Sequence, residues 1–158
     1  FTAVDRDRLL AAAMELPPGL VFDVDDPRLA TPGDMVRKVQ DVIQDSGWAP
    51  SRRKAVVVRT ILDSLATKLA QTVHEAAALS HTSVEVVHVV GGGAQNHGLC
   101  QLLADAAGLP VIAGPVEATA LGNALVQARA HGTLRGDLES LRGLVSATHE
   151  LIRFEPRP

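Results

Sequence analysis

The chain has 158 residues, of which 46% are hydrophobic and 21% charged, and its formal net charge at pH 7 is -3. A chain of this length buries roughly 70% of the surface that it exposes when unfolded, which is enough for one sizeable core. The charge balance excludes a strongly basic surface of the kind that attracts nucleic acid or acidic membranes. We therefore expect a soluble globular protein with no nucleic-acid and no membrane partner.

The charge and hydropathy pattern of the sequence predicts neither a membrane span nor a secretory signal. The longest stretch without a formal charge, residues 86–104, contains glycines, an asparagine and histidines, so it does not predict a membrane span. No charged segment precedes an apolar one at the start, which argues against a secretory signal. The single cysteine, Cys100, fits a reducing compartment and predicts a cytoplasmic location. The sequence opens on Phe1 within a helical pattern, and we expect the chain to be a fragment of a longer polypeptide.

The first half of the chain predicts three helices. The first covers residues 4–16 and is followed by a short strand over residues 20–24. The second begins at an N-cap threonine, Thr31, and runs to Asp45. The third, residues 52–79, is the longest and carries one apolar stripe at helical spacing. That stripe consists of Val58, Ile61, Leu62, Leu65, Leu69, Val73 and Ala76.

The second half alternates strands and helices. A β-branched strand over residues 84–90 precedes a helix that ends at Gly108, and a second strand over residues 110–113 precedes a helix over residues 117–130. Short connections of this kind predict parallel strands with a right-handed crossover. The tail is moderately helical and becomes extended near residues 152–154. The expected fold class is α/β.

Three consecutive glycines, Gly91, Gly92 and Gly93, lie between the first of these strands and the following helix. Ligands of open α/β sheets bind in the crevice outside the carboxyl ends of the strands, and glycines there let a nucleotide approach the backbone. A tight turn that only lets the helix pack on the sheet is the alternative. Asn96 lies at or near the N-cap of that helix, where it either caps the helix or bonds an adenine.

The spacing of Gly91, Gly93 and Asn96 comes close to the fingerprint of dinucleotide-binding domains. Glu117 follows at roughly the spacing expected of the acid that binds the ribose. The residues disfavour that interpretation, because Asn96 replaces the third glycine and Glu117 falls at a helix start rather than at the end of the second strand. The histidines show no zinc-ligand spacing, so we expect no protein-bound metal. Cys100 has no motif around it and is expected to be a buried, inert thiol.

Three segments resemble the C-terminal region of the FGGY carbohydrate kinases. Residues 87–130 read VHVVGGGAQNHGLCQLLADAAGLPVIAGPVEATALGNALVQARA, of which AGPVEATALGN is the most specific part. Upstream, residues 58–66 (VRTILDSLA) and residues 23–35 (DVDDPRLATPGDM) also match the family pattern. The resemblance therefore covers nearly the whole chain, and within the family it is nearest to the rhamnulokinase branch.

The resemblance implies an actin-like ATPase fold, related to ribonuclease H, in which two similar domains close on a cleft. Residues 1–158 would then form most of the second domain, without its start and without the N-terminal domain. It also implies that Gly92 contacts the nucleotide through its backbone and that Asn96 lies beside the adenine, with Gly91 and Gly93 as supporting positions. Small residues of the last predicted helix would let it approach the nucleotide strand closely. These are Ala118, Ala120, Gly122 and Ala124.

The activity implied for the parent enzyme is transfer of the ATP γ-phosphoryl group to a ketose, L-rhamnulose, which gives the 1-phosphate. Mg²⁺ would arrive with the nucleotide. The catalytic aspartate is expected before Phe1, so we assign no catalytic residue to this chain and expect the fragment alone to be inactive. Two alternatives remain: a non-catalytic nucleotide-binding or interaction module of the actin-like superfamily, and a dinucleotide-binding domain.

Overall fold

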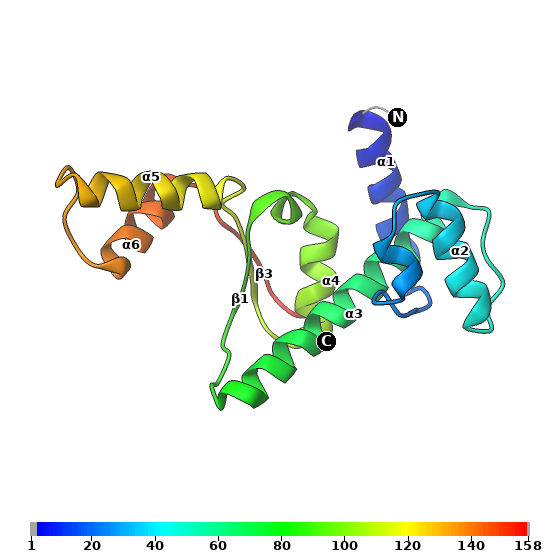
Figure 1. The fold of residues 1–158 in the computed structure, drawn as a ribbon. Coiled ribbons are helices and arrows are strands. Elements are labelled where there is room, and N and C mark those ends of the chain that lie inside the picture. The colour runs from blue at the N-terminus through cyan, green and yellow to red at the C-terminus, as the bar shows by residue number, and fades with distance from the viewer. Residues whose placement is uncertain (1–2, 158) are drawn as a thin grey trace. The chain divides into compact units, whose positions relative to one another are not determined.

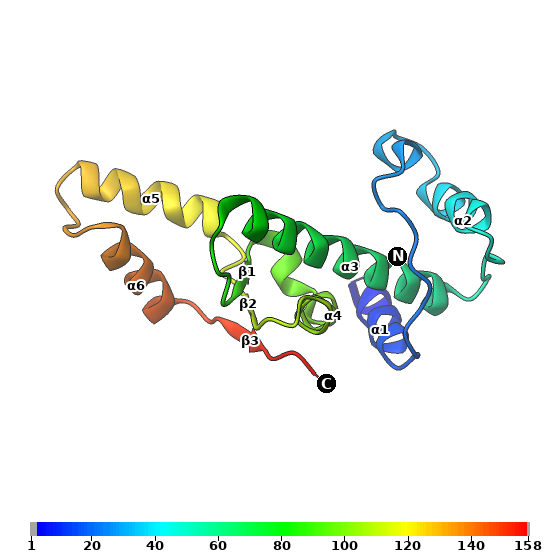
Figure 2. The same ribbon diagram turned by 90° about the horizontal axis from the view of Figure 1, so that it is seen from below.

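A computed structural model describes residues 3–157 and divides the chain into two compact units, residues 1–80 and residues 81–158. Each unit is described by itself. Figures 1 and 2 show the ribbon in two views, with the first unit in blue to green and the second in green to red.

The first unit is helical. It contains helix α1 (Ala3–Met14), the 3₁₀ turn η1 (Pro27–Ala30), helix α2 (Met35–Asp45) and the long helix α3 (Lys54–Ser80). The three helices expected from the sequence are confirmed. The strand expected over residues 20–24 is wrong, because this segment has no strand partner. Its backbone is hydrogen-bonded to α3 instead: the Phe22 N–H donates to Ser64 Oγ at 3.1 Å.

Helix α2 begins later than the sequence suggested. Its N-cap is Asp34, whose Oδ1 accepts from the Arg37 N–H at 3.1 Å. The expected N-cap, Thr31, instead ends η1, where its hydroxyl donates to the Arg28 carbonyl at 3.1 Å. Asparagine, aspartate and serine outrank threonine at N-caps, so the later aspartate is the stronger cap of the two.

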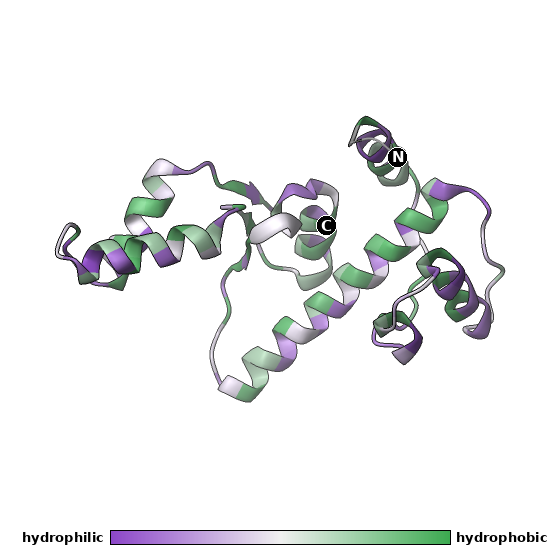
Figure 3. Cartoon of the chain, turned by 45° about the horizontal axis from the view of Figure 1, so that its top comes forward, coloured by the Kyte–Doolittle hydropathy of each residue, from purple (hydrophilic) through white to green (hydrophobic). Residues whose placement is uncertain are grey.

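The core of the first unit forms around α2. Phe22, Val39, Val42 and Ile43 are buried together. The stripe expected along α3 is only partly correct, since Leu62 is buried but Leu69 is 42% exposed. Figure 3 shows polar and apolar segments alternating along α3. Its buried face includes four polar residues, Arg59, Thr60, Asp63 and Ser64.

The second unit is an α/β arrangement around a three-stranded sheet of order β1-β2-β3. Strand β1 runs parallel to β2, with Val87 opposite Val111, and β2 runs antiparallel to β3. The expected parallel strand-helix-strand unit is therefore confirmed. The elements in chain order are β1 (Val87–Val89), η2 (Gly91–Gln95), α4 (His97–Ala107), β2 (Val111–Ala113), α5 (Ala118–Ala130), α6 (Leu138–Thr148) and β3 (Ile152–Phe154).

Helix α4 packs on this sheet and carries most of the unit's core. Cys100, Ala104 and the facing strand residue Val111 have no exposed surface. The helix ends at Gly108, whose φ of 63° places it in the left-handed region that favours glycine. The sequence analysis predicted both helix α4 and its end at Gly108.

The C-terminal segment is held against α4. The Arg157 guanidinium and Asp105 carboxylate form an ion pair at 2.6 Å, and Gln101 Nε2 donates to the Glu155 carbonyl at 2.8 Å. Burial raises the pKa of Asp105, but hydrogen bonds from Arg157 outweigh it and leave that pKa below its ordinary value. The last strand is thereby fixed next to β2.

Helices α5 and α6 are far less buried. Helix α5 has no buried residue and α6 has one, Leu141. The close approach expected of the small residues in α5 is wrong for Ala120, Gly122 and Ala124, which are exposed. A Cβ added to Gly122 would meet nothing within 4 Å. Among residues 3–157, none of the helices combines the length and hydropathy that crossing a bilayer requires.

Candidate functional site

The glycine turn, residues Gly91–Gln95, lies directly after β1. Gly91 has a φ of 75°, a backbone conformation that side-chain-bearing residues rarely adopt. Its N–H donates to the Pro115 carbonyl at 3.3 Å, and the Gly114 N–H donates to the Val89 carbonyl at 2.8 Å. These bonds join the segments that follow the two parallel strands. The turn therefore lies at the carboxyl edge of the sheet, as the sequence indicated.

The backbone of the turn is open to approach. Gly92 and Gly93 are exposed. A Cβ added to Gly92 would meet nothing within 4 Å, and one added to Gly93 would meet only Val89 Cγ1, at 3.7 Å. The protein's own packing therefore does not require glycine at Gly92. A ligand that lies on the backbone does require it, because a side chain there would fill the space that the ligand takes.

Asn96 caps helix α4. Its Oδ1 accepts from the Leu99 N–H at 3.1 Å, which confirms the capping interpretation. Within the described part of the chain, no protein acceptor pairs with its Nδ2 group. The side chain is half-buried, so it can cap the helix and still donate to a ligand. Capping and adenine binding are therefore compatible at this residue.

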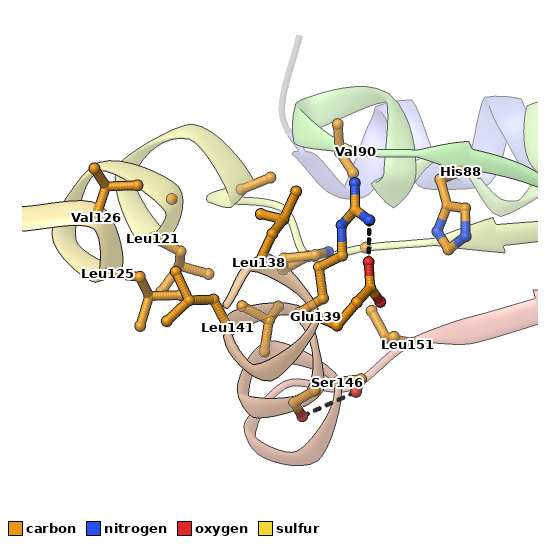
Figure 4. A pocket seen from close by; sticks show the side chains of 17 residues that line it. His88, Val90, Leu121, Leu125, Val126, Leu138, Glu139, Leu141, Ser146 and Leu151 are labelled. Carbon is orange, nitrogen blue, oxygen red and sulfur yellow. Dashed lines mark hydrogen bonds and ion pairs between the residues drawn. The ribbon is translucent and has the colours of Figure 1, made fainter. Parts of the chain in front are cut away.

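A groove of about 910 Å³ begins beside the glycine turn. Val90, Gly114 and Pro115 line its end at the sheet, and helices α5 and α6 form its walls (Figure 4). Its lining is mainly aliphatic, with an ion pair between Glu139 and Arg142 at 2.5 Å. The sequence analysis missed this groove, because α6 carries no motif and the spacing of α5 predicted packing rather than an open face.

Two interpretations from the sequence can be placed in this geometry. Cys100 is fully buried, and burial raises the pKa of its thiol, which fits an inert side chain. Glu117 is the exposed N-cap residue of α5 and makes no side-chain cap bond. The residue that follows β2 is Gly114, so the place of a ribose-binding acid in a dinucleotide site is not filled by a carboxylate.

Metal-ligating side chains do not gather anywhere in the described range. Within residues 3–157, no group of three or more histidine, cysteine, aspartate or glutamate residues could hold a metal ion. The chemistry that this site offers is therefore exposed backbone, an asparagine amide and an apolar groove.

Comparison with known families identifies the chain. The model of the C-terminal domain of the FGGY family of carbohydrate kinases matches residues 4–131. The chain belongs to the FGGY family. Both the glycine turn and Asn96 lie inside the matched region, whereas α6 and β3 lie outside it.

Two curated relatives have the same name. A rhamnulokinase of Bacteroides thetaiotaomicron is 37% identical over 137 residues, which cover 87% of this chain and 28% of the relative. A rhamnulokinase of Pectobacterium carotovorum is 37% identical over 154 residues, which cover 97% of this chain and 31% of the relative. The chain thus spans less than a third of the length of the relatives it matches.

A solved structure supports the fold. The crystal structure of xylulose kinase from Rhodospirillum rubrum matches with a TM-score of 0.64 and 21% identity, covering 97% of this chain and 30% of that one. The fold class expected from the sequence, an α/β fragment of the actin-like kinase fold, is confirmed. At this identity the comparison supports the fold alone.

Proposed function

We propose that this chain is the nucleotide-binding C-terminal part of an ATP-dependent sugar kinase whose acceptor is L-rhamnulose. Residues 1–158 would form most of the second of its two domains. The observation that carries the proposal is the open backbone over Gly92, at the carboxyl edge of two parallel strands in a chain of the FGGY family. Open backbone at such an edge suits a nucleotide.

Each member of the site has a distinct part in this proposal. Gly92 offers the backbone contact, and Gly91 and Gly93 shape the turn that presents it. Asn96 donates from Nδ2 to the adenine while its Oδ1 caps α4. ATP or ADP is thus the ligand of this chain, and Mg²⁺ comes with the phosphates.

In this proposal the catalytic groups lie outside the 158-residue chain. Phosphoryl transfer needs a carboxylate that accepts the hydroxyl proton, together with charge neutralisation of the phosphates. We place these groups in the remainder of the parent enzyme. The 158-residue chain by itself is expected to bind nucleotide weakly and to transfer nothing. Its cytoplasmic location stays a prediction.

An ADP titration followed by amide chemical shifts tests the site. The amides of residues 91–96 should move first, because they would touch the ligand. The substitution Gly92→Ala should weaken ADP binding about tenfold, which equals ~1.4 kcal/mol. It should not disturb the fold, because the added Cβ meets no atom within 4 Å. Gln127→Ala is the control, because Gln127 is exposed on α5 and lies outside the groove lining.

Shifts that spare residues 91–96 while other amides respond would overturn the site assignment. The absence of any response at roughly millimolar ADP would favour the non-catalytic interaction module instead. A preference for NAD over ADP would favour the dinucleotide-binding domain.

The acceptor sugar rests on the two relatives named rhamnulokinase. The parent enzyme should phosphorylate L-rhamnulose with a higher kcat/KM than D-xylulose, as measured by coupled ADP release. Equal values, or a preference for D-xylulose, would contradict the acceptor while leaving the nucleotide site untouched. Phosphorylation of L-rhamnulose by the 158-residue chain itself would contradict the placement of the catalytic groups.

A further inference from the structure

The C-terminal segment, residues 150–157, lies against both parts of the second unit that carry the glycine turn. It contains β3, the strand next to β2 in the sheet (Figure 2). None of the residues assigned to the nucleotide belongs to this segment. Its contacts with the loop after β2 and with the first turn of α4 nevertheless place it where it can support the site without touching the ligand.

The start of the segment packs against Gly114. A Cβ added to Gly114 would lie 3.0 Å from the Glu150 carbonyl oxygen and 3.3 Å from Leu151 Cδ2, so the segment fills the space beside this glycine. Gly114 leads into Pro115, whose carbonyl accepts from the Gly91 N–H at 3.3 Å. The C-terminal segment therefore supports the loop to which the glycine turn is bonded.

The middle of the segment contacts the first turn of α4. The ring centroids of Phe154 and His97 lie 5.7 Å apart, with an angle of 51° between the ring planes. Aromatic pairs at such separations favour tilted arrangements over flat stacking. Phe154 is half-buried on β3, whereas His97 is exposed at the start of α4. His97 directly follows Asn96, so the contact restrains the neighbour of the residue assigned to the adenine.

The end of the segment is bonded to α4 further along that helix. Besides its ion pair with Asp105, Arg157 donates its backbone N–H to Asp105 Oδ1 at 2.9 Å. The Glu155 carbonyl accepts from Gln101 Nε2 at 2.8 Å. The pairing of β3 with β2 holds the chain before Phe154, and these bonds hold it afterwards. The phenyl ring is therefore held in register with the first turn of α4.

We propose that Phe154 is a positioning residue of the nucleotide site. Through His97 it holds the first turn of α4 in the orientation in which Asn96 both caps the helix and presents its Nδ2 group. Asn96 has only this donor to offer a ligand, because its Oδ1 is bonded to the Leu99 N–H at 3.1 Å. A shift of the turn would misdirect that donor. The inference rests on the proposed function for the ligand, whereas the support of the cap does not.

Exchange of the Leu99 amide hydrogen with solvent tests the support in the absence of nucleotide. Phe154→Leu keeps an apolar side chain on β3 but removes the ring, and Phe154→Tyr retains a ring. In the ligand-free 158-residue chain, Phe154→Leu should speed exchange of the Leu99 amide about threefold, because the cap opens more often without the ring contact. Phe154→Tyr should exchange at the rate of the unsubstituted chain. An unchanged rate in Phe154→Leu would overturn the inference.

Leu141→Val separates positioning from a general loss of stability. Leu141 is the buried residue of α6, so the substitution removes buried apolar surface from the same unit at a different helix. It should lower the midpoint of thermal unfolding while leaving exchange of the Leu99 amide unchanged. If Leu141→Val and Phe154→Leu speed that exchange equally for an equal loss of stability, Phe154 has only a structural role and the inference is wrong.

An ADP titration then measures the consequence for the ligand. Phe154→Leu should weaken ADP binding about threefold, whereas Phe154→Tyr and Leu141→Val should bind as the unsubstituted chain does. Equal affinity of Phe154→Leu and the unsubstituted chain would contradict a positioning role. If the unsubstituted chain does not respond to ADP, the proposed function fails by itself, and exchange of the Leu99 amide still decides whether Phe154 holds the cap.

Discussion

Removing the carboxylate of Asp63 should destabilise the first unit more than any surface substitution there. Asp63 and Arg59 form an ion pair on the buried face of α3, with side chains 10% and 8% exposed. Arg59 Nε lies 3.0 Å from Oδ1 and 2.9 Å from Oδ2 of Asp63. The same two side chains bind the N-terminal segment, since Asp63 accepts from the Gly19 N–H and Arg59 donates to the Leu16 carbonyl.

The magnitude follows from what Asp63→Ala leaves behind. The substitution strands the buried Arg59 guanidinium without its counter-charge, and breaking such a pair costs about 3–5 kcal/mol. The Gly19 N–H also loses its acceptor. Replacing both partners, as Arg59→Met with Asp63→Ala, removes the stranded charge. The double variant should therefore cost only about 2 kcal/mol, chiefly from the two backbone groups left unpaired.

Trp48 provides the assay. It is the only tryptophan of the chain and lies in the first unit, so its fluorescence during guanidinium chloride unfolding reports on that unit. Asp45→Ala is the matched control, because Asp45 pairs with Arg28 on the surface, with side chains 66% and 43% exposed. The Asp45→Ala variant should have nearly the same free energy of unfolding as the unsubstituted chain.

Two outcomes would refute the reasoning. If Asp63→Ala costs no more than Asp45→Ala, the buried pair does not hold the segment around Gly19. If the double variant is less stable than Asp63→Ala, the stranded Arg59 charge is not the source of the loss. Should Asp63→Ala fail to fold, Asp63→Asn keeps one acceptor and should cost about 1–3 kcal/mol.

Three smaller predictions follow from single contacts. Asn96→Ala should lower the stability of the second unit by about 1 kcal/mol in thermal unfolding, because α4 loses its cap, while Asn96→Asp should not. Gly114→Ala should cost about 1–3 kcal/mol in the same assay, since φ is 111° and the new Cβ would lie 3.0 Å from the Glu150 carbonyl oxygen. Hydrogen bonds from Arg28 lower the pKa of Asp26 to about 2. The stabilisation from ionised Asp26 is therefore complete above its ordinary pKa of 3.8 and lost as the pH falls through about 2, and an NMR titration should show Arg28→Gln raising that pKa.

What the sequence predicted correctly depends on local signals. Helix α4 is bounded by Asn96 and Gly108, and both residues act on their own neighbours. The parallel pairing of β1 and β2 follows from a strand-helix-strand pattern with short connections. The glycine turn at the sheet edge follows from the same pattern. These features needed no knowledge of distant contacts.

What the sequence missed depends on partners far along the chain. The strand expected over residues 20–24 does not form, because Ser64 of α3 takes the hydrogen bond that a neighbouring strand would provide. The apolar stripe of α3 is incomplete because part of the buried face of this helix is polar: Arg59 and Asp63 are buried beside the Gly19 segment, whereas Leu69 is 42% exposed. The groove was missed because the spacing of apolar residues in α5 predicts a packed helix, whereas α5 has no buried residue in the structure.

The backbone of the glycine turn is held by contacts within the second unit. Bonds between the glycine turn and the segment after β2 fix Gly91, and the Asn96 cap fixes the start of α4. A ligand that binds at the turn would not have to order this backbone, so it would lose little conformational entropy there. In the proposed function, the weak affinity expected of the 158-residue chain would then come from the absence of the opposite wall of the site. It follows that adding the rest of the parent enzyme should strengthen ADP binding without changing which amides of residues 91–96 respond, and that a changed set of responding amides would show the turn to be shaped from outside this unit.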